Sequence, residues 1–320
     1  MNNATLSFSN GKWTATYAGK ILASSPNKEY ITNNIRNGRC TKANMVNVTD
    51  VIEIGETAIN TKTGQVEKIE RFTITERFNF LEDFTGMVAD RTSASLLVTG
   101  EGGLGKTFTI MKSLKRLGFK NVNDLIGFSS GDNIPPELSK TLYTVVKGFS
   151  TAKGLYRTLF ENRNGLVIFD DCDSVLKDPV AVNLLKGALD SYDKRTITWN
   201  AESSFGGEDD LPKSFEFKGG VIFISNMNIL KIDQAIRTRA ITVDLSMTTA
   251  QKIERMSTII RSEEFLPSYE MTTKENALAF LESMQHEAKE ISFRTLIAVT
   301  KVAGRGNDWE RRAEYLLTAV

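Results

Sequence analysis

From residue 95 onward, short apolar runs alternate with stretches in which apolar residues recur every three or four positions. An unbroken apolar run is typical of a strand that is buried on both faces of a parallel sheet, and the wider spacing indicates helices. The chain therefore predicts an α/β core with a largely parallel sheet, and a helix over 78–91 leads into it. The expected strands are 95–99, 142–147, 166–170, 221–225 and 240–244.

After residue 248 the strand pattern stops and only helical spacing remains. The sequence predicts a separate small helical domain with four helices, over 249–261, 274–288, 292–303 and 308–320. Polar residues that commonly cap helices stand near the four expected starts, namely Thr249, Thr273, Ser292 and Asp308.

The first 72 residues differ from the rest, with short alternating segments separated by turn-forming Gly and Asn. They predict a small β-rich domain, so the expected division is 1–72, a core over 73–246 and a helical domain over 247–320. Basic residues in this first domain are interleaved with Trp13, Tyr17 and Tyr30. Two interpretations stay open: a nucleic-acid surface, or the commoner case of a solvated face over a small aromatic core.

Bulk properties narrow the function classes only slightly. The chain has 320 residues, 41% hydrophobic and 25% charged, and its formal charge of +1 neither favours nor excludes nucleic acid. It has neither a signal-peptide pattern nor an apolar run near the ~20 residues that span a bilayer. We therefore expect a cytoplasmic protein with Cys40 and Cys172 reduced, and the single histidine, His286, argues against a histidine triad or multi-histidine metal site.

The segment after the strand at 95–99 matches the pattern G-x-x-x-x-G-K-[ST] at every fixed position, and a helix over 108–117 is expected next. Strand, glycine-rich loop and helix are the order that a phosphate-binding loop requires. Its glycines let backbone N–H groups face phosphate oxygens, while Lys106 can reach the terminal phosphates and Thr107 can bind Mg²⁺. The expected nucleotide-binding residues are Gly100, Glu101, Gly102, Gly103, Leu104, Gly105, Lys106, Thr107 and Phe108.

Polar residues end two further apolar strands. Asp170 and Asp171 follow the run that begins at residue 166, and Asn226 follows the run that begins at 221. A buried strand that ends in two carboxylates suits a site for Mg²⁺ and phosphate. We expect Asp170 to hold the metal, Asp171 to polarise the attacking water and Asn226 to position that water.

Taken in this order, these motifs resemble the AAA+ family of ATPases over residues 75–320. The resemblance leaves open a bacteriophage-type member, and a phage-encoded protein is expected in the host cytoplasm. The resemblance implies an arginine finger in the segment 237–239, where Arg239 is favoured over Arg237, and a nucleotide-sensing Arg294 in a helical lid. It also implies ATP and Mg²⁺ as cofactors and a homo-oligomer, expected to be a hexameric ring.

One departure from the family pattern concerns Asp171, because the family usually carries Glu at this position. Aspartate is one methylene shorter, so the catalytic water can be less well placed. General-base assistance contributes about 10²–10⁴-fold to a rate, and hydrolysis is therefore expected to be slow rather than absent.

Two loops are candidates for contact with a substrate. Phe149 follows the second core strand, where the family places an aromatic pore loop, but it can equally be a core residue. Alternating segments at 195–199 and 213–218 predict a long hairpin with Lys213, Lys218 and an acidic tip at 208–210. Three functions stay open: a motor on DNA or RNA, which we place first, a remodeller of protein partners, and a slowly hydrolysing assembly scaffold.

Overall fold

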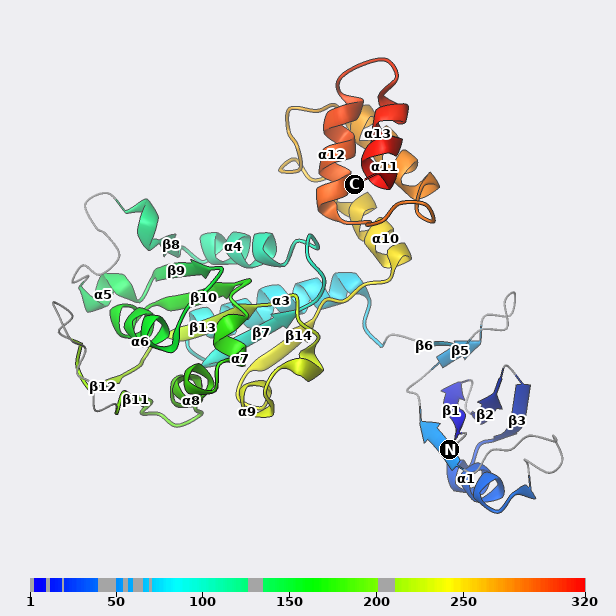
Figure 1. Cartoon of the computed structure of the whole chain (residues 1–320), viewed down its shortest axis with the longest axis horizontal. Coiled ribbons are helices and arrows are strands. Elements are labelled where there is room, and N and C mark those ends of the chain that lie inside the picture. Colours follow the sequence, from blue (N-terminus) through cyan, green and yellow to red (C-terminus); the bar gives the residue numbers. More distant parts are fainter. Residues whose placement is uncertain are drawn as a thin grey trace. The chain divides into compact units, whose positions relative to one another are not determined.

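The computed structural model describes residues 3–9, 12–18, 20–39, 50–53, 57–59, 66–68, 71–125, 135–200 and 211–319. The chain forms two compact units, Met1–Thr73 and Ile74–Val320 (Figure 1). The expected strand at 46–48, Cys40 and the expected acidic tip at 208–210 lie outside the described residues.

In its described residues, the first unit contains a four-stranded sheet with one helix against it. Strands β1 (Asn3–Ser9), β2 (Lys12–Tyr17) and β3 (Lys20–Ser25) form an antiparallel meander, and β4 (Asp50–Glu53) pairs parallel to β1. A separate antiparallel pair joins β5 (Thr57–Ile59) and β6 (Val66–Lys68). The β-rich prediction is confirmed.

Helix α1 (Lys28–Arg36) was not predicted. Its buried face is marked by only two apolar residues, Ile31 and Ile35, and asparagines that are typical of turns surround them. Both isoleucines pack into the small core of the unit, and the side chain of Asn27 caps the helix by accepting a hydrogen bond from the Tyr30 amide.

The second unit contains a six-stranded, fully parallel sheet with the order β14-β7-β13-β10-β9-β8, which confirms the predicted fold class. In this order β13 lies between β7 and β10 although it follows both in sequence. The strands are β7 (Ser95–Thr99), β8 (Lys120–Asn121), β9 (Leu142–Lys147), β10 (Leu166–Asp170), β13 (Gly220–Ile224) and β14 (Ile241–Asp244).

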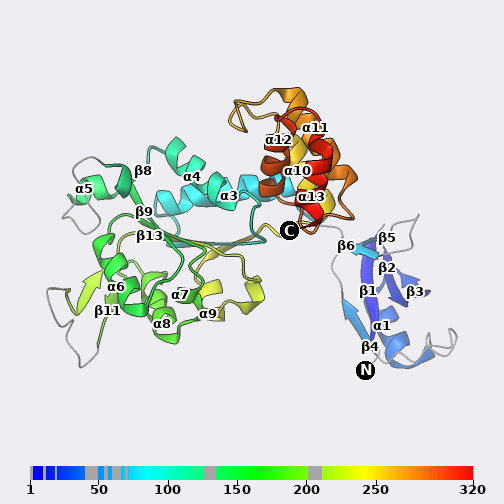
Figure 2. The ribbon, with the colours of Figure 1, turned by 45° about the horizontal axis from the view of Figure 1, so that its top comes forward.

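Helices cover both faces of this sheet, which explains why β7, β10 and β13 are buried along their whole length (Figure 2). Side chains alternate along each strand, so Ile168 packs toward α3 (Ile74–Ala89) and α4 (Lys106–Arg116), whereas Phe169 packs toward the opposite layer. That layer contains α6 (Ala152–Glu161), α7 (Ser174–Lys177), α8 (Pro179–Ala188) and α9 (Gln234–Arg237). Shorter elements are η1 (Val122–Asp124), α5 (Pro136–Ser139) and η2 (Ile229–Lys231).

Four helices at the C-terminal end share a hydrophobic core of their own, which includes Met256, Leu281 and Leu296. They are α10 (Thr249–Ile259), α11 (Met271–Ser283), α12 (Phe293–Ala303) and α13 (Trp309–Thr318). We call these four helices the lid. In the ranges that the structure describes, no helix is long and apolar enough to cross a bilayer.

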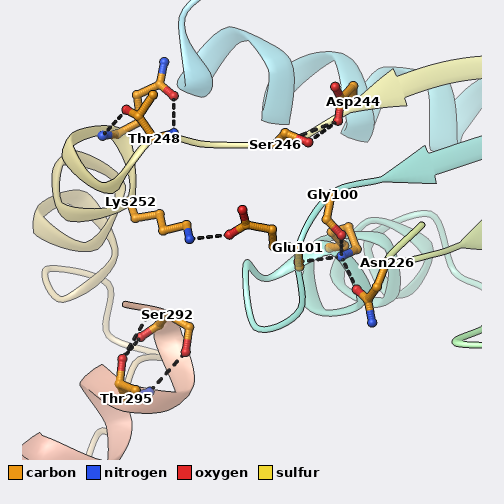
Figure 3. A network of polar contacts seen from close by, with 11 residues as sticks. Gly100, Glu101, Asn226, Asp244, Ser246, Thr248, Lys252, Ser292 and Thr295 are labelled. Atoms are coloured by element: carbon orange, nitrogen blue, oxygen red, sulfur yellow. Dashed lines mark hydrogen bonds and ion pairs between the residues drawn. The ribbon is translucent and has the colours of Figure 1, made fainter. Parts of the chain in front are cut away.

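Helix caps in the lid agree only partly with the sequence. Ser292 caps α12 as expected, in a reciprocal capping box with Thr295 (Figure 3). The cap of α10 is Thr248 rather than the expected Thr249, and α11 begins two residues before the expected Thr273. Asp308 stands before α13, but its backbone is left-handed, with φ 59°, and its side chain makes no capping hydrogen bond.

The capping box at α10 gives a stability prediction. Thr248→Ala removes the oxygen that accepts from the Gln251 amide, so the free energy of unfolding should fall by about 1 kcal/mol. Thr249→Ala is the matched control, because this exposed neighbour is not the cap residue, and it should change stability by much less. Urea unfolding of both variants checks this, and equal losses would contradict the assigned cap.

Candidate functional site

The candidate site lies where β7, β13 and β10 end, next to the loop 100–105 that joins β7 to α4. In a parallel sheet, a crevice opens at the carboxyl ends of the strands where the strand order changes direction. Gly100 is required there, because a Cβ at this position would lie 3.0 Å from the backbone carbon of Leu245. Gly105, with φ 86°, supplies the left-handed turn that begins α4.

Lys106 is buried under the loop, with 5% of its surface exposed. Its Nζ donates to the carbonyls of Gly100 and Glu101, at 2.7 Å each, and to Asn226 Oδ1 at 2.9 Å (Figure 3). Burial lowers the pKa of Lys106 to about 8, although the carboxylates of Asp171 and Asp170 act in the opposite direction. The ammonium group is therefore poorly solvated in this structure, and a phosphate anion would compensate its charge.

Thr107 and Asp170 come together from α4 and the end of β10. The Thr107 hydroxyl donates to Asp170 Oδ1 at 2.9 Å, and Lys147 Nζ at the end of β9 lies 3.3 Å from Asp170 Oδ2. A hydroxyl and a carboxylate oxygen are the hard ligands that Mg²⁺ accepts together with phosphate oxygens and water. This pair fits a magnesium site of that kind. Sequence reasoning missed Lys147, and only the pairing of β9 with β10 reveals it.

Asp171 and Asn226 form the third part of the site. Asn226 Nδ2 donates to Asp171 Oδ1 at 2.7 Å, so one amide side chain joins Lys106 to Asp171. Asp171 has φ 54°, in the left-handed region that aspartate tolerates better than most residues with a Cβ. The backbone conformation thus gives a physical reason for an aspartate at this position.

A second acidic residue near the site, Asp173, is engaged elsewhere. Its carboxylate accepts from the hydroxyl of Ser225 at 2.6 Å, and that hydroxyl also accepts from the Met227 amide at 3.0 Å. Ser225 is buried directly before Asn226, so this pair fixes the end of β13. The arrangement favours a positioning role for Asp173 over a role at the attacking water.

The predicted arginines divide into two groups. Arg294 of the lid reaches the loop, because its Nη1 would lie 3.7 Å from a Cβ at Gly102, and the Phe293 amide donates to the Gly103 carbonyl at 2.9 Å. Arg237 instead donates through Nε to the Ile232 carbonyl at 3.0 Å, and the exposed Arg239 donates to the Ala235 carbonyl at 3.1 Å. Neither of these two arginines is among the residues that line the site.

Two cavities adjoin the loop. The first, of about 150 Å³, is lined by 102–108 together with Asp170, Asp171, Ile224, Asn226 and Arg294. The second, of about 410 Å³, shares Gly103, Leu104, Gly105, Phe108 and Arg294 with it and extends between the lid and helices α3 and α4. Sequence reasoning missed the second cavity, because its apolar walls come from four helices whose spacing indicates only buried faces.

The two candidate substrate loops lie elsewhere in the core. Phe149 is 78% exposed, which removes the interpretation of this side chain as a core residue. The base of the expected hairpin is present as β11 (Thr196–Thr198) paired antiparallel with β12 (Ser214–Glu216). Lys213 is exposed, whereas Lys218 pairs with Glu216 at 3.2 Å.

Comparison with known proteins gives distant relatives. No family model matches the chain. An uncharacterised 36.7 kDa protein of Enterobacteria phage T4, from the nrdC–mobD intergenic region, is 28% identical over an alignment of 256 residues, and the match covers 75% of this chain and 73% of the phage protein. The FIGL-1 AAA domain, solved in complex with ADP, aligns with 76% of this chain and 81% of its own, with 13% identity and a TM-score of 0.40. The structure of C. elegans PCH-2 aligns with 76% of this chain and 66% of its own chain, also with 13% identity and a TM-score of 0.40.

An ion pair connects the lid to the phosphate-binding loop. Lys252 of α10 extends to the carboxylate of Glu101 (Figure 3). The lysine side chain is 11% exposed and the glutamate side chain 60%, so the pair is shielded from water on one side only. Sequence reasoning did not identify this contact.

This ion pair gives a second stability prediction. Glu101→Lys and Lys252→Glu should each lower the free energy of unfolding by about 1 kcal/mol, because each places like charges together. The double charge reversal should restore most of that loss. Urea unfolding of the four proteins in a double-mutant cycle measures the coupling, and purely additive losses would show that the two side chains do not interact.

Proposed function

We propose that this protein is a Mg²⁺-dependent ATPase of the AAA+ type that works as a homo-oligomeric ring. One observation carries the proposal: a single cavity collects a metal-binding pair, a buried lysine and a carboxylate–amide pair from different elements. These are the groups that phosphoryl transfer to water requires, since catalysis there depends on positioning and on compensation of charge.

Each group has a distinct role in this proposal. Lys106 exchanges its loop carbonyls for the terminal phosphate oxygens, and the N–H groups of the loop bind the same phosphates. Thr107 and Asp170 hold Mg²⁺, which supplies charge compensation on the phosphates when bound. Asp171 accepts the proton of the attacking water, and Asn226 fixes the direction of the Asp171 carboxylate through its 2.7 Å hydrogen bond.

The larger cavity suits the nucleoside. Its volume of about 410 Å³ lies in the range of about 300–1,000 Å³ that small-molecule sites occupy, and its walls are mainly apolar. It meets the phosphate cavity at Gly103, Leu104 and Gly105. A nucleoside triphosphate can therefore extend from one cavity into the other across the loop.

A second subunit completes the site in this proposal. Arg239 is exposed at the end of α9 and absent from the residues that line its own cavity. A guanidinium group supplied by a neighbour would stabilise the charge that develops on the transferred phosphoryl group. We assign this role to Arg239, with Arg237 as the second candidate, and nucleotide sensing to Arg294, which already lies beside the loop.

For the substrate of the ring we place nucleic acid first. The exposed Phe149 can stack on unpaired bases, and the exposed Lys213 can face phosphates. The same Phe149 also supports the alternative, a remodeller that grips protein segments. ATPase stimulation by single-stranded DNA or RNA, compared with stimulation by an unfolded protein, separates the two, and stimulation by neither favours a slowly hydrolysing scaffold.

Phosphate binding should depend on Lys106. Lys106→Ala removes the buried cation, so we expect at least a tenfold loss of ATP affinity, about 1.4 kcal/mol. Lys115→Ala removes an exposed lysine of the same helix and is the matched control. Calorimetric titration with ATP and Mg²⁺ checks both variants, and unchanged affinity for Lys106→Ala would refute the phosphate cradle.

Turnover should depend on Asp171. Asp171→Asn keeps the size and the hydrogen bond to Asn226 but cannot accept a proton, so ATP should still bind while hydrolysis falls about 10²–10⁴-fold. Asp173→Asn is the control, because its amide oxygen can still accept from Ser225, and it should keep most of the activity. If the two variants exchange these phenotypes in a phosphate-release assay, Asp173 is the base.

Arg239 should act between subunits. Arg239→Ala should bind ATP almost normally and hydrolyse it poorly, and mixing it with Asp171→Asn protein should restore part of the activity wherever an intact Asp171 faces an intact Arg239. This assumes that neighbouring sites can act independently. Parental activity of Arg239→Ala alone would transfer the role to Arg237, and silent substitutions at both would remove the shared site.

A further inference from the structure

We propose that Arg255 of α10 contacts the nucleobase and gives the site its preference for purine nucleoside triphosphates. The inference rests on the proposed function, since it concerns the half of the nucleotide that the phosphate loop does not hold. It depends on the larger cavity, on the surroundings of the Arg255 side chain, and on the charges that share the cavity with it.

The cavity around Arg255 is lined mainly by apolar groups, which suit a flat apolar group of a ligand. Its walls come from α3, α4 and the lid, and aromatic and aliphatic side chains dominate them. Phe78 and Leu104 belong to the core side, whereas Ile259, Phe265 and Phe293 belong to the lid side. A purine ring would remove more apolar surface from water here than a pyrimidine ring, and it would therefore bind more tightly.

Arg255 contributes a guanidinium group to this cavity. The group lies over the ring of Phe78, with 4.3 Å between the guanidinium carbon and the ring centroid. Its Nε is buried and has no hydrogen-bond partner within the described part of the chain. Burial also lowers the pKa of Arg255, so its charge is poorly solvated. A buried guanidinium group without a polar partner is unfavourable, and an acceptor atom of a ligand would relieve this cost.

Three other charged side chains of the cavity already have partners. Lys112 and Glu264 form an ion pair at 2.6 Å, and Glu82 pairs with Arg116 at 2.9 Å. Arg294 lines both this cavity and the phosphate cavity. Arg255 lines the cavity without belonging to either ion pair, so its guanidinium group can donate to a ligand without breaking them.

The chemistry that fits these conditions is a planar base with acceptor atoms on its edge. A guanidinium group stacks on flat rings and donates in its own plane, and both purines present the N7 acceptor on an edge that pyrimidines lack. Arg255 would thus contact the base through its donors while Phe78 fixes the plane of the guanidinium group. The phosphates are held elsewhere, by the loop and Lys106.

The test distinguishes the contribution of the base to binding affinity from the contribution of the phosphates. Wild-type protein, Arg255→Met and Arg255→Lys are titrated with ATP, GTP, CTP and inorganic tripolyphosphate, all with Mg²⁺. Arg261→Met is the matched control, because it removes an exposed arginine of the lid that does not line the cavity. We expect Arg255→Met to lose about tenfold in affinity for ATP and GTP and to bind tripolyphosphate within about twofold of wild type.

Each other outcome is decisive. Unchanged ATP affinity in Arg255→Met, or an equal loss for ATP and tripolyphosphate, overturns the contact with the base. Wild-type affinity for CTP equal to that for ATP overturns the preference for purines. Arg255→Lys keeps the charge but lacks the planar fork, so parental ATP affinity in this variant also overturns the contact. Failure of the wild type to bind both ATP and tripolyphosphate refutes the proposed function itself, and tripolyphosphate binding by the variants shows that the loop is folded.

Discussion

The position of β13 between β7 and β10 is the constraint on which the candidate site depends. Parallel pairing with both neighbours brings the ends of the three strands to one edge of the sheet. Asn226 consequently lies within hydrogen-bond distance of both Lys106 and Asp171, although 120 and 55 residues separate it from them. Neither contact would form if β10 paired directly with β7, because the Asn226 strand would then lie outside the site.

Charge compensation explains much of the remaining geometry. Cations and carboxylates lie close together in the site. Lys147 pairs with Asp170, and Asn226 connects Lys106 to Asp171 through two hydrogen bonds. Lys106 donates to backbone carbonyls that cannot neutralise its charge, and burial lowers its pKa to about 8. A site of this kind is organised before the anion arrives, and a phosphate group would replace weak partners with a strong one.

The lid is attached to the parts of the core that would contact a nucleotide. Lys252 binds Glu101, the Phe293 amide binds the Gly103 carbonyl, and Arg77 donates to the carbonyls of Asp244 and Ser246 in the segment that enters the lid. A displacement of the loop backbone would therefore change contacts that α10 and α12 make. In the proposed function, this linkage connects occupancy of the phosphate cavity to the position of Arg294 and Arg255.

The sequence by itself determined the features whose cause is local. Buried apolar runs predicted β7, β9, β10, β13 and β14 to within one residue at each end, and the spacing of Gly, Lys and Thr after β7 predicted the loop 100–105 and the helix behind it. The capping residue Ser292 was also predictable, since a cap depends on the three residues that follow it. Local patterns were less reliable for α1 and for the start of α11, where few apolar residues or competing polar ones mark the boundary.

Only the tertiary structure decided which side chains meet across elements. The pairing of β9 with β10 brings Lys147 to Asp170, the packing of the lid brings Lys252 to Glu101 and Arg255 to Phe78, and the path of the chain leaves Phe149 exposed. None of these contacts has a signature in sequence spacing, because each joins residues from elements that are adjacent only after the sheet and the lid have formed. Consecutive residues specify the glycine-rich loop 100–105, whereas the cavity beside it forms only when the helices and loops that line it pack together.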